Sequence, residues 1–80
     1  MKNRHIWSVD DDKVACEAYL AGLSKNDADK IARSRRIKIK SFMMKIDNFK
    51  YLATDGQKGL SNCSKQSQQV WEEYKKSGKL

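Results

Sequence analysis

Apolar positions recur three and four residues apart along most of this chain, which is the spacing of helices rather than of strands. The sequence therefore predicts an all-α protein: three helices that include a helix-turn-helix, followed by a fourth, C-terminal helix. The pattern is strongest over residues 38–50. Its inward positions are Ile39, Phe42, Met43, Ile46 and Phe49. The chain has 80 residues, no proline and no internal repeat, so we expect a single domain over residues 1–80.

Serines mark the beginnings of three of these helices, because a serine hydroxyl can accept a hydrogen bond from a free N–H group of the first turn. Ser8 with Asp11 and Ser24 with Asp27 both have the S-x-x-D spacing of a capping box, and Ser64 or a neighbour begins the last helix. The expected inward positions of these helices are Val14, Ala15, Ala18, Tyr19, Ala28, Ile31, Ala32, Val70, Trp71 and Tyr74. The expected connections are Gly22, which ends the first helix, the turn 33–36 and the loop 53–63.

Basic residues are concentrated in the middle third of the chain. The formal net charge is +7, from 17 Lys and Arg against 10 Asp and Glu, and residues 25–50 carry nine basic and three acidic groups. Five of the eight residues 33–40 are basic and none is acidic. A surface that faces nucleic-acid phosphates requires such an excess, although a solvated lysine-rich surface has the same composition.

In a helix-turn-helix the last helix enters the major groove of DNA, and its outward side chains reach base edges. Lysine suits guanine O6 and N7, asparagine suits adenine, and serine suits either. The predicted base contacts are Lys38, Ser41, Lys45 and Asn48. The predicted phosphate contacts are Arg33, Arg35, Arg36, Lys40, Lys58 and Lys65. Double-stranded DNA is accordingly the expected partner.

Two motifs resemble known modules. Residues 6–12 (IWSVDDD) resemble the W-[ST]-x-E-E-[DE] opening of Myb/SANT-like helix-turn-helix domains. The segments SFMMKIDNF (41–49), GLSN (59–62) and VWEEY (70–74) resemble the N-terminal module of many bacterial HNH-type restriction endonucleases. The resemblance implies a helical, DNA-recognising domain without its nuclease domain. The basic turn 33–36 replaces the usual Gly-Arg-Ser of that family.

Catalysis is not expected. An HNH nuclease needs a histidine general base and further residues that hold a metal, and His5 is the single histidine. Three successive carboxylates at residues 10–12 point about 100° apart on a helix, where they complement the helix dipole rather than converge on a metal. Cys16 and Cys63 have no ligand or base nearby and are expected to remain thiols. No cofactor and no metal are predicted.

The sequence thus predicts a DNA-binding protein, such as a small regulator or an accessory protein of a phage or other mobile element. A single recognition helix seldom binds one site tightly, which leaves room for a homodimer or a protein partner. One alternative is a protein-binding adaptor or inhibitor with a SANT-like fold, and another is a DNA-targeting module of a nuclease system with a separate catalytic subunit. No apolar run of about 18 residues is present, so the expected location is the cytoplasm of a bacterium or of a phage-infected host cell.

Overall fold

The protein folds into α-helices. The computed structural model describes residues 7–61 and 63–78, and this part of the chain contains four α-helices and no strand. Their bounds are Val9–Ala21 (α1), Lys25–Ser34 (α2), Ile39–Ala53 (α3) and Lys65–Lys76 (α4). The all-α prediction with a fourth, C-terminal helix is therefore confirmed. His5, Ile6 and Asn62, on which parts of the sequence argument rest, lie outside the described residues.

The predicted serine caps are all present. The Ser8 hydroxyl accepts a hydrogen bond from the Asp11 backbone N–H at 3.1 Å, and the Asp11 carboxylate accepts one from the Ser8 N–H at 3.2 Å, which completes the capping box. Ser24 accepts in the same way from the Asp27 N–H at 3.2 Å. The N-cap of α4 is Ser64, and that of α3 is Lys38, which makes no side-chain cap.

The turn between α2 and α3 lies two residues later than predicted, at residues 35–38, because α2 continues to Ser34. Helix α2 ends in a Schellman motif, in which the Ile37 N–H donates to the Ala32 carbonyl at 2.8 Å and the Arg36 N–H to the Arg33 carbonyl at 3.1 Å. The residue at the left-handed position of this motif is Arg36, with φ of 59°. Glycine is the usual residue there, so an arginine adopts this backbone conformation at some cost.

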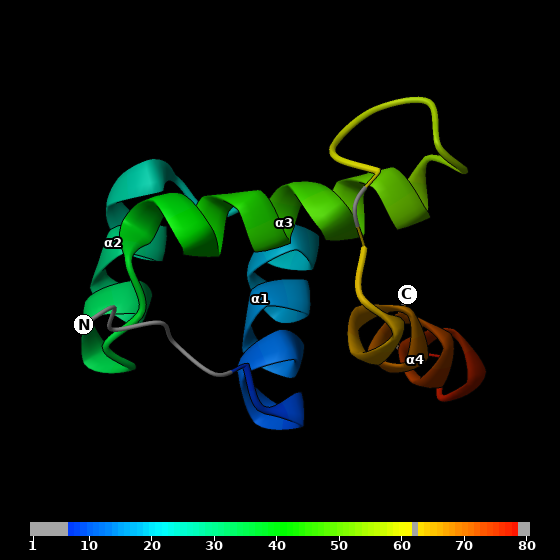
Figure 1. The fold of residues 1–80 in the computed structure, drawn as a ribbon, viewed down its shortest axis with the longest axis horizontal. Helices are drawn as coiled ribbons and strands as arrows, with labels where there is room; N and C mark the ends of the chain where they lie inside the picture. Colours follow the sequence, from blue (N-terminus) through cyan, green and yellow to red (C-terminus); the bar gives the residue numbers. More distant parts are fainter. Residues whose placement is uncertain (1–6, 62, 79–80) are drawn as a thin grey trace.

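Helix α3 is the central element of the fold and contacts each of the other three helices. In Figure 1 it crosses the ends of α1 and α2, while α4 lies beneath its C-terminal half. The buried core residues come from all four helices and the α2–α3 turn: Ala15, Cys16, Ala18, Ala28, Ala32, Ile37, Phe42, Phe49, Val70, Trp71 and Tyr74. The remaining predicted inward positions, Val14, Tyr19, Ile31, Ile39, Met43 and Ile46, are partly buried and pack against this core.

The loop after α3 folds back onto the helix that precedes it. Helix α3 runs to Ala53, three residues beyond the predicted end at Lys50. The Leu60 N–H then donates to the Asp47 carbonyl at 3.2 Å. Gly59 lies so close that a Cβ built on it would be 2.3 Å from the Asp47 oxygen. The loop therefore covers part of the C-terminal half of α3 and leaves its N-terminal half uncovered.

Candidate nucleic-acid interface

Lys45, one of the predicted base contacts, is not on the surface. Its ammonium Nζ lies 3.3 Å from Oδ1 of Asp12 and donates a hydrogen bond to the Ser67 hydroxyl at 2.9 Å. The Lys45 side chain is 10% exposed and that of Asp12 is 0% exposed. The prediction that Lys45 faces solvent is therefore wrong, because this side chain joins α3 to both α1 and α4.

The surroundings of Lys45 form a buried polar network. The Asp12 carboxylate also accepts hydrogen bonds from the Ser67 hydroxyl at 3.0 Å and from the Gln66 amide at 2.6 Å. The same Gln66 amide donates to the Trp7 carbonyl at 3.0 Å. The Lys45 ammonium lies 4.8 Å from the centroid of the Trp7 ring, within cation–π distance. This network, with donors on every side of the Asp12 carboxylate, is structural.

Asn48 is a second predicted base contact that the structure buries. Its residue exposure is 8%, and among the described residues its Oδ1 atom has no hydrogen-bond partner. The Cys63 thiol donates to its backbone carbonyl at 3.4 Å, which holds the end of the loop against α3. The prediction that Asn48 lies on an outward face is wrong, because helix periodicity does not show that a loop and a fourth helix cover this side of α3.

Arg35, a predicted phosphate contact, is turned toward α1. Its Nε donates to Asp11 at 2.7 Å and its NH2 group to Asp10 at 2.9 Å. These hydrogen bonds raise the pKa of Arg35 further above its ordinary value, first through Asp11 and then through Asp10. The acidic run Asp10–Asp12 therefore does more than complement the helix dipole, since Asp10 and Asp11 hold Arg35 and Asp12 holds Lys45.

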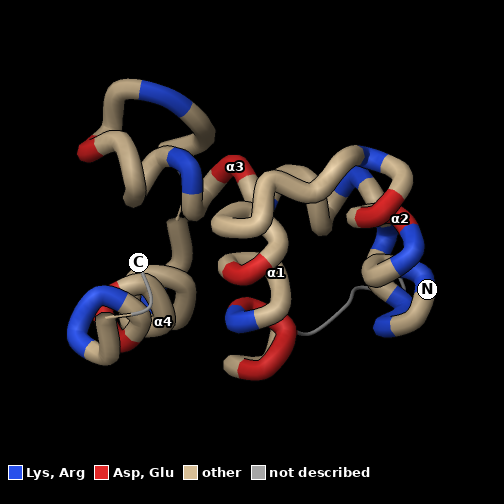
Figure 2. Tube along the Cα trace, turned by 180° about the vertical axis from the view of Figure 1, so that it is seen from behind, with Lys and Arg blue, Asp and Glu red and all other residues tan. Residues whose placement is uncertain are grey.

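Four basic residues remain exposed where α2 meets α3, and we call them the basic edge: Arg33, Arg36, Lys38 and Lys40. Within the described residues, Arg36, Lys38 and Lys40 make no ion pair. Arg33 pairs with Asp29 on its own helix at 3.0 Å, but its side chain is 80% exposed. Figure 2 shows basic positions along α2 and the α2–α3 turn, with acidic positions also on α2, whereas the first turn of α1 is acidic.

The outward row of α3 lies one residue before the predicted row of Ser41, Lys45 and Asn48. The most exposed positions of its N-terminal half are Lys40 and Met44, which are four residues apart, and Asp47 follows three residues later. Met44 is 48% exposed. Ser41 lies beside this row and is half-buried. Of the four predicted base contacts, Lys38 and Ser41 thus remain accessible.

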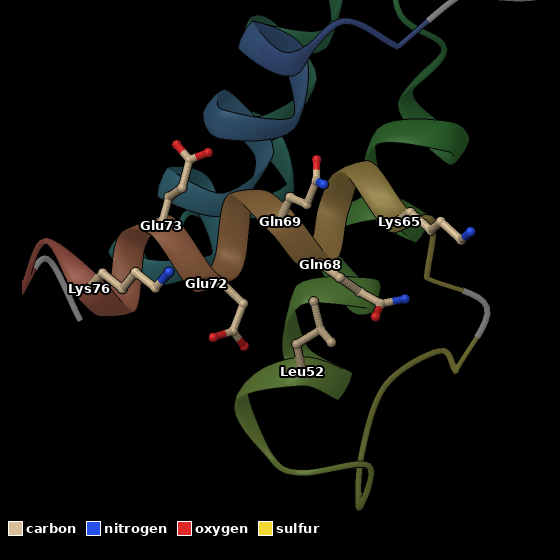
Figure 3. Close-up of a pocket in the computed structure, with 7 residues that line it drawn as sticks. All are labelled: Leu52, Lys65, Gln68, Gln69, Glu72, Glu73 and Lys76. Atoms are coloured by element: carbon tan, nitrogen blue, oxygen red, sulfur yellow. The ribbon is translucent and has the colours of Figure 1, made fainter.

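The structure does not bring Lys58 and Lys65 together with the basic edge. Lys58 lies in the loop after α3, at the end of that helix far from α2 (Figure 1). Lys65 is the first residue of α4, where it lines an open hollow of about 560 Å³ between α4 and the end of α3. The hollow is lined by Leu52, Lys65, Gln68, Gln69, Glu72, Glu73 and Lys76 (Figure 3). Its charges have both signs, so it is not an extension of the basic surface.

The described residues include no group of three or more His, Cys, Asp or Glu side chains that could hold a metal ion. In the same part of the chain, no helix is both long and apolar enough to cross a membrane. Comparison with family models, with curated proteins and with solved structures finds no match for this chain. The resemblance to the HNH-associated module therefore stays a prediction that rests on the sequence motifs.

Proposed function

We propose that this protein binds double-stranded DNA through the basic edge, with the N-terminal half of α3 directed into the major groove. The single observation that carries the proposal is the exposure of Arg36, Lys38 and Lys40, three cations within five residues and without a partner in the described chain. Phosphates bind such a cluster by releasing condensed counterions.

The conformation of Arg36 supports this assignment. It is one of only two residues other than glycine with positive φ in the described chain, and the other is Asp55 in the loop after α3. Glycine adopts this conformation with less strain, so an arginine at this position lowers the stability of the fold relative to glycine. Strained backbone conformations cluster at functional sites. The side chain is exposed, as contact with an external partner requires.

The loop after α3 limits which part of this helix could enter a groove. Because residues 59 and 60 pack on Asp47, the loop lies against the C-terminal half of α3 and leaves its first turns free of the loop. The base-facing candidates in these turns are Lys40, Ser41 and Met44, with Lys38 and Arg36 placed before them toward the phosphates. Lys45 and Asn48 have structural roles, and Lys58 and Lys65 lie apart from this surface.

Binding of fluorescent duplex DNA, measured by anisotropy at about 50 and 200 mM salt, tests the proposal. The affinity should fall steeply with salt, and Arg36→Ala or Lys38→Ala should each flatten the slope of log K against log salt by about one unit. Lys76→Ala is the matched control, since Lys76 is an exposed lysine on α4. It should leave the slope unchanged.

No binding at the lower salt, or equal losses for Lys76→Ala and Arg36→Ala, would contradict the proposal. The basic edge would then fit an acidic protein instead, as the adaptor alternative requires. Within the DNA-binding proposal, a regulator that acts alone and a targeting module of a nuclease system both use the same surface. Co-purification with a nuclease subunit distinguishes the second role from the first.

A further inference from the structure

The accessible part of α3 carries an exposed apolar side chain among its cations. Four large apolar residues of the described chain are exposed, and Met44 has the highest exposure of them at 48%. The others are Val9, Leu20 and Leu60, and none of these three lies on α3. Met44 stands one helical turn after Lys40, on the same outward row.

On duplex DNA, the main group that an apolar side chain such as Met44 can contact is the thymine methyl group. In the major groove each base pair shows hydrogen-bond donors and acceptors, and thymine alone adds an apolar group, its C5 methyl. Met44 has no hydrogen-bond donor, and its thioether is a weak acceptor, so it would gain little beside the polar edges of the other bases. Its flexible, unbranched side chain suits an apolar contact whose geometry varies with the sequence.

We infer that Met44 contacts the C5 methyl group of thymine and biases the protein toward A·T-containing sites. This inference rests on the proposed DNA binding and adds to it the class of base that is read. Arg36 and Lys38 would hold the start of α3 near the phosphates, so that the outward row that follows, Lys40 and Met44, faces the groove.

The position of Asp47 strengthens the assignment to Met44. Asp47 follows on the same row, and its carboxylate would be repelled by phosphates. The loop residues 59 and 60 pack on its backbone. Beyond Met44 this row therefore meets the Asp47 carboxylate and the loop, and Met44 is the one exposed large apolar side chain of α3.

Replacing thymine by uracil tests the inference, because the exchange removes the C5 methyl and keeps every Watson–Crick hydrogen bond. The affinity of the wild-type protein for an alternating A·T duplex should exceed that for the A·U duplex of the same length by about fourfold per contacted methyl. Met44→Ala should bind both duplexes equally, and Met44→Leu should retain most of the preference. Leu20→Ala, an exposed apolar position on α1, should keep the wild-type ratio.

The possible failures are distinguishable. Equal affinity of the wild-type protein for the A·T and A·U duplexes would overturn the inference while leaving DNA binding intact. A methyl preference that persists undiminished in Met44→Ala would also overturn it, because another residue or the DNA shape would then read the methyl. Absence of binding to every duplex would refute the proposed function itself, and the inference with it.

Discussion

Lys45 of α3 and Asp12 of α1 form an ion pair that is almost closed to water, with Nζ and Oδ1 3.3 Å apart and side-chain exposures of 10% and 0%. A buried carboxylate is costly unless donors surround it, and here Ser67 and Gln66 of α4 supply two more hydrogen bonds. Side chains of α3 and α4 thus both contact the Asp12 carboxylate of α1. The pair and its hydrogen bonds therefore join α4 to α1 and α3.

Removal of the ammonium should be strongly destabilising. Lys45→Met keeps the unbranched apolar stem of the side chain but leaves Asp12 buried without its counter-charge, so we expect a loss of about 3–5 kcal/mol in the free energy of unfolding. Urea denaturation followed by far-UV circular dichroism measures this loss. In Asp12→Asn/Lys45→Met both charges are gone, and the double variant should be more stable than Lys45→Met alone.

The exposed pair of Lys75 and Glu72, with 3.7 Å between Nζ and Oε2, provides the matched control. Lys75→Met should change the stability by less than about 1 kcal/mol, since surface ion pairs contribute little. If Lys45→Met were as mild as Lys75→Met, the buried ion pair would not organise the fold.

Arg36→Gly should separate stability from DNA binding. Because Arg36 occupies a left-handed backbone conformation, glycine there should raise the free energy of unfolding by up to about 1 kcal/mol. The same substitution removes a cation of the basic edge, so the affinity for duplex DNA should fall. Thermal unfolding and anisotropy on the same sample measure both effects. If the variant is more stable and binds DNA as tightly as the wild type, Arg36 does not contribute to DNA binding.

The sequence predicted the helices well because their signals are local. A serine cap acts within three residues, as at Ser8, Ser24 and Ser64, and the apolar stripe of α3 identifies its core side without any knowledge of its neighbours. The last turn of α3 lies outside the apolar stripe, and hydrogen bonds that this stripe does not indicate hold it. The Thr54 hydroxyl donates to the Lys50 carbonyl at 2.9 Å, and the Gly56 N–H donates to the Tyr51 carbonyl at 2.9 Å.

The candidate site was predicted less well because burial of a polar residue depends on a distant partner. Lys45 and Asn48 are polar, and periodicity assigns polar residues to the solvent side of a helix. A signal for Lys45 was nonetheless present. Three consecutive aspartates at the start of α1 carry more negative charge than the helix dipole alone would stabilise. Such a cluster indicates that cations of other helices pair with it, and in the structure these are Lys45 and Arg35.

Arg35 should act on stability rather than on DNA affinity. Its guanidinium joins the turn after α2 to the first turn of α1 through Asp10 and Asp11. Arg35→Ala should therefore lower the melting temperature, and the loss should shrink as salt screens the exposed Asp10 contact. Arg35→Lys should recover only part of the stability, because lysine lacks the two-pronged geometry. A fall in DNA affinity without a change in melting temperature would contradict this and support the original prediction that Arg35 contacts phosphate.

Gly59→Ala should detach or distort the loop after α3. A Cβ at this position would lie 2.3 Å from the Asp47 carbonyl oxygen and 2.7 Å from the Tyr51 nitrogen, and φ is already 92°. We expect a loss of about 1–3 kcal/mol and faster proteolytic cleavage within residues 54–61. Gly78→Ala is the control, since its φ is 74° but a Cβ there would meet nothing within 4 Å. Equal effects of both substitutions would show that backbone strain alone, and not the contact with α3, is responsible.

The two cysteines should differ in reactivity and in their effect at high pH. Burial, with the nearby charges of Glu17 and Asp12, raises the pKa of Cys16 from 9.0 to about 12, whereas Cys63 is only half-buried. Iodoacetamide should therefore alkylate Cys63 first, and Cys16 only as the protein unfolds, which mass spectrometry of the peptides can follow. Comparable alkylation rates in the folded protein would contradict the burial of Cys16.

The raised pKa of Cys16 also makes the stability depend on pH. Between pH 9 and about 12 the unfolded chain loses the Cys16 proton while the folded chain keeps it, so the stability falls as the pH rises through this window. The free energy of unfolding of the wild type should thus fall more steeply than that of Cys16→Ala, by the equivalent of about one proton. Tyr74, whose pKa burial also raises, contributes to both slopes, and its coupling with Cys16 is lost in Cys16→Ala. Parallel slopes for the two proteins would mean that the Cys16 thiol ionises as readily in the folded as in the unfolded chain.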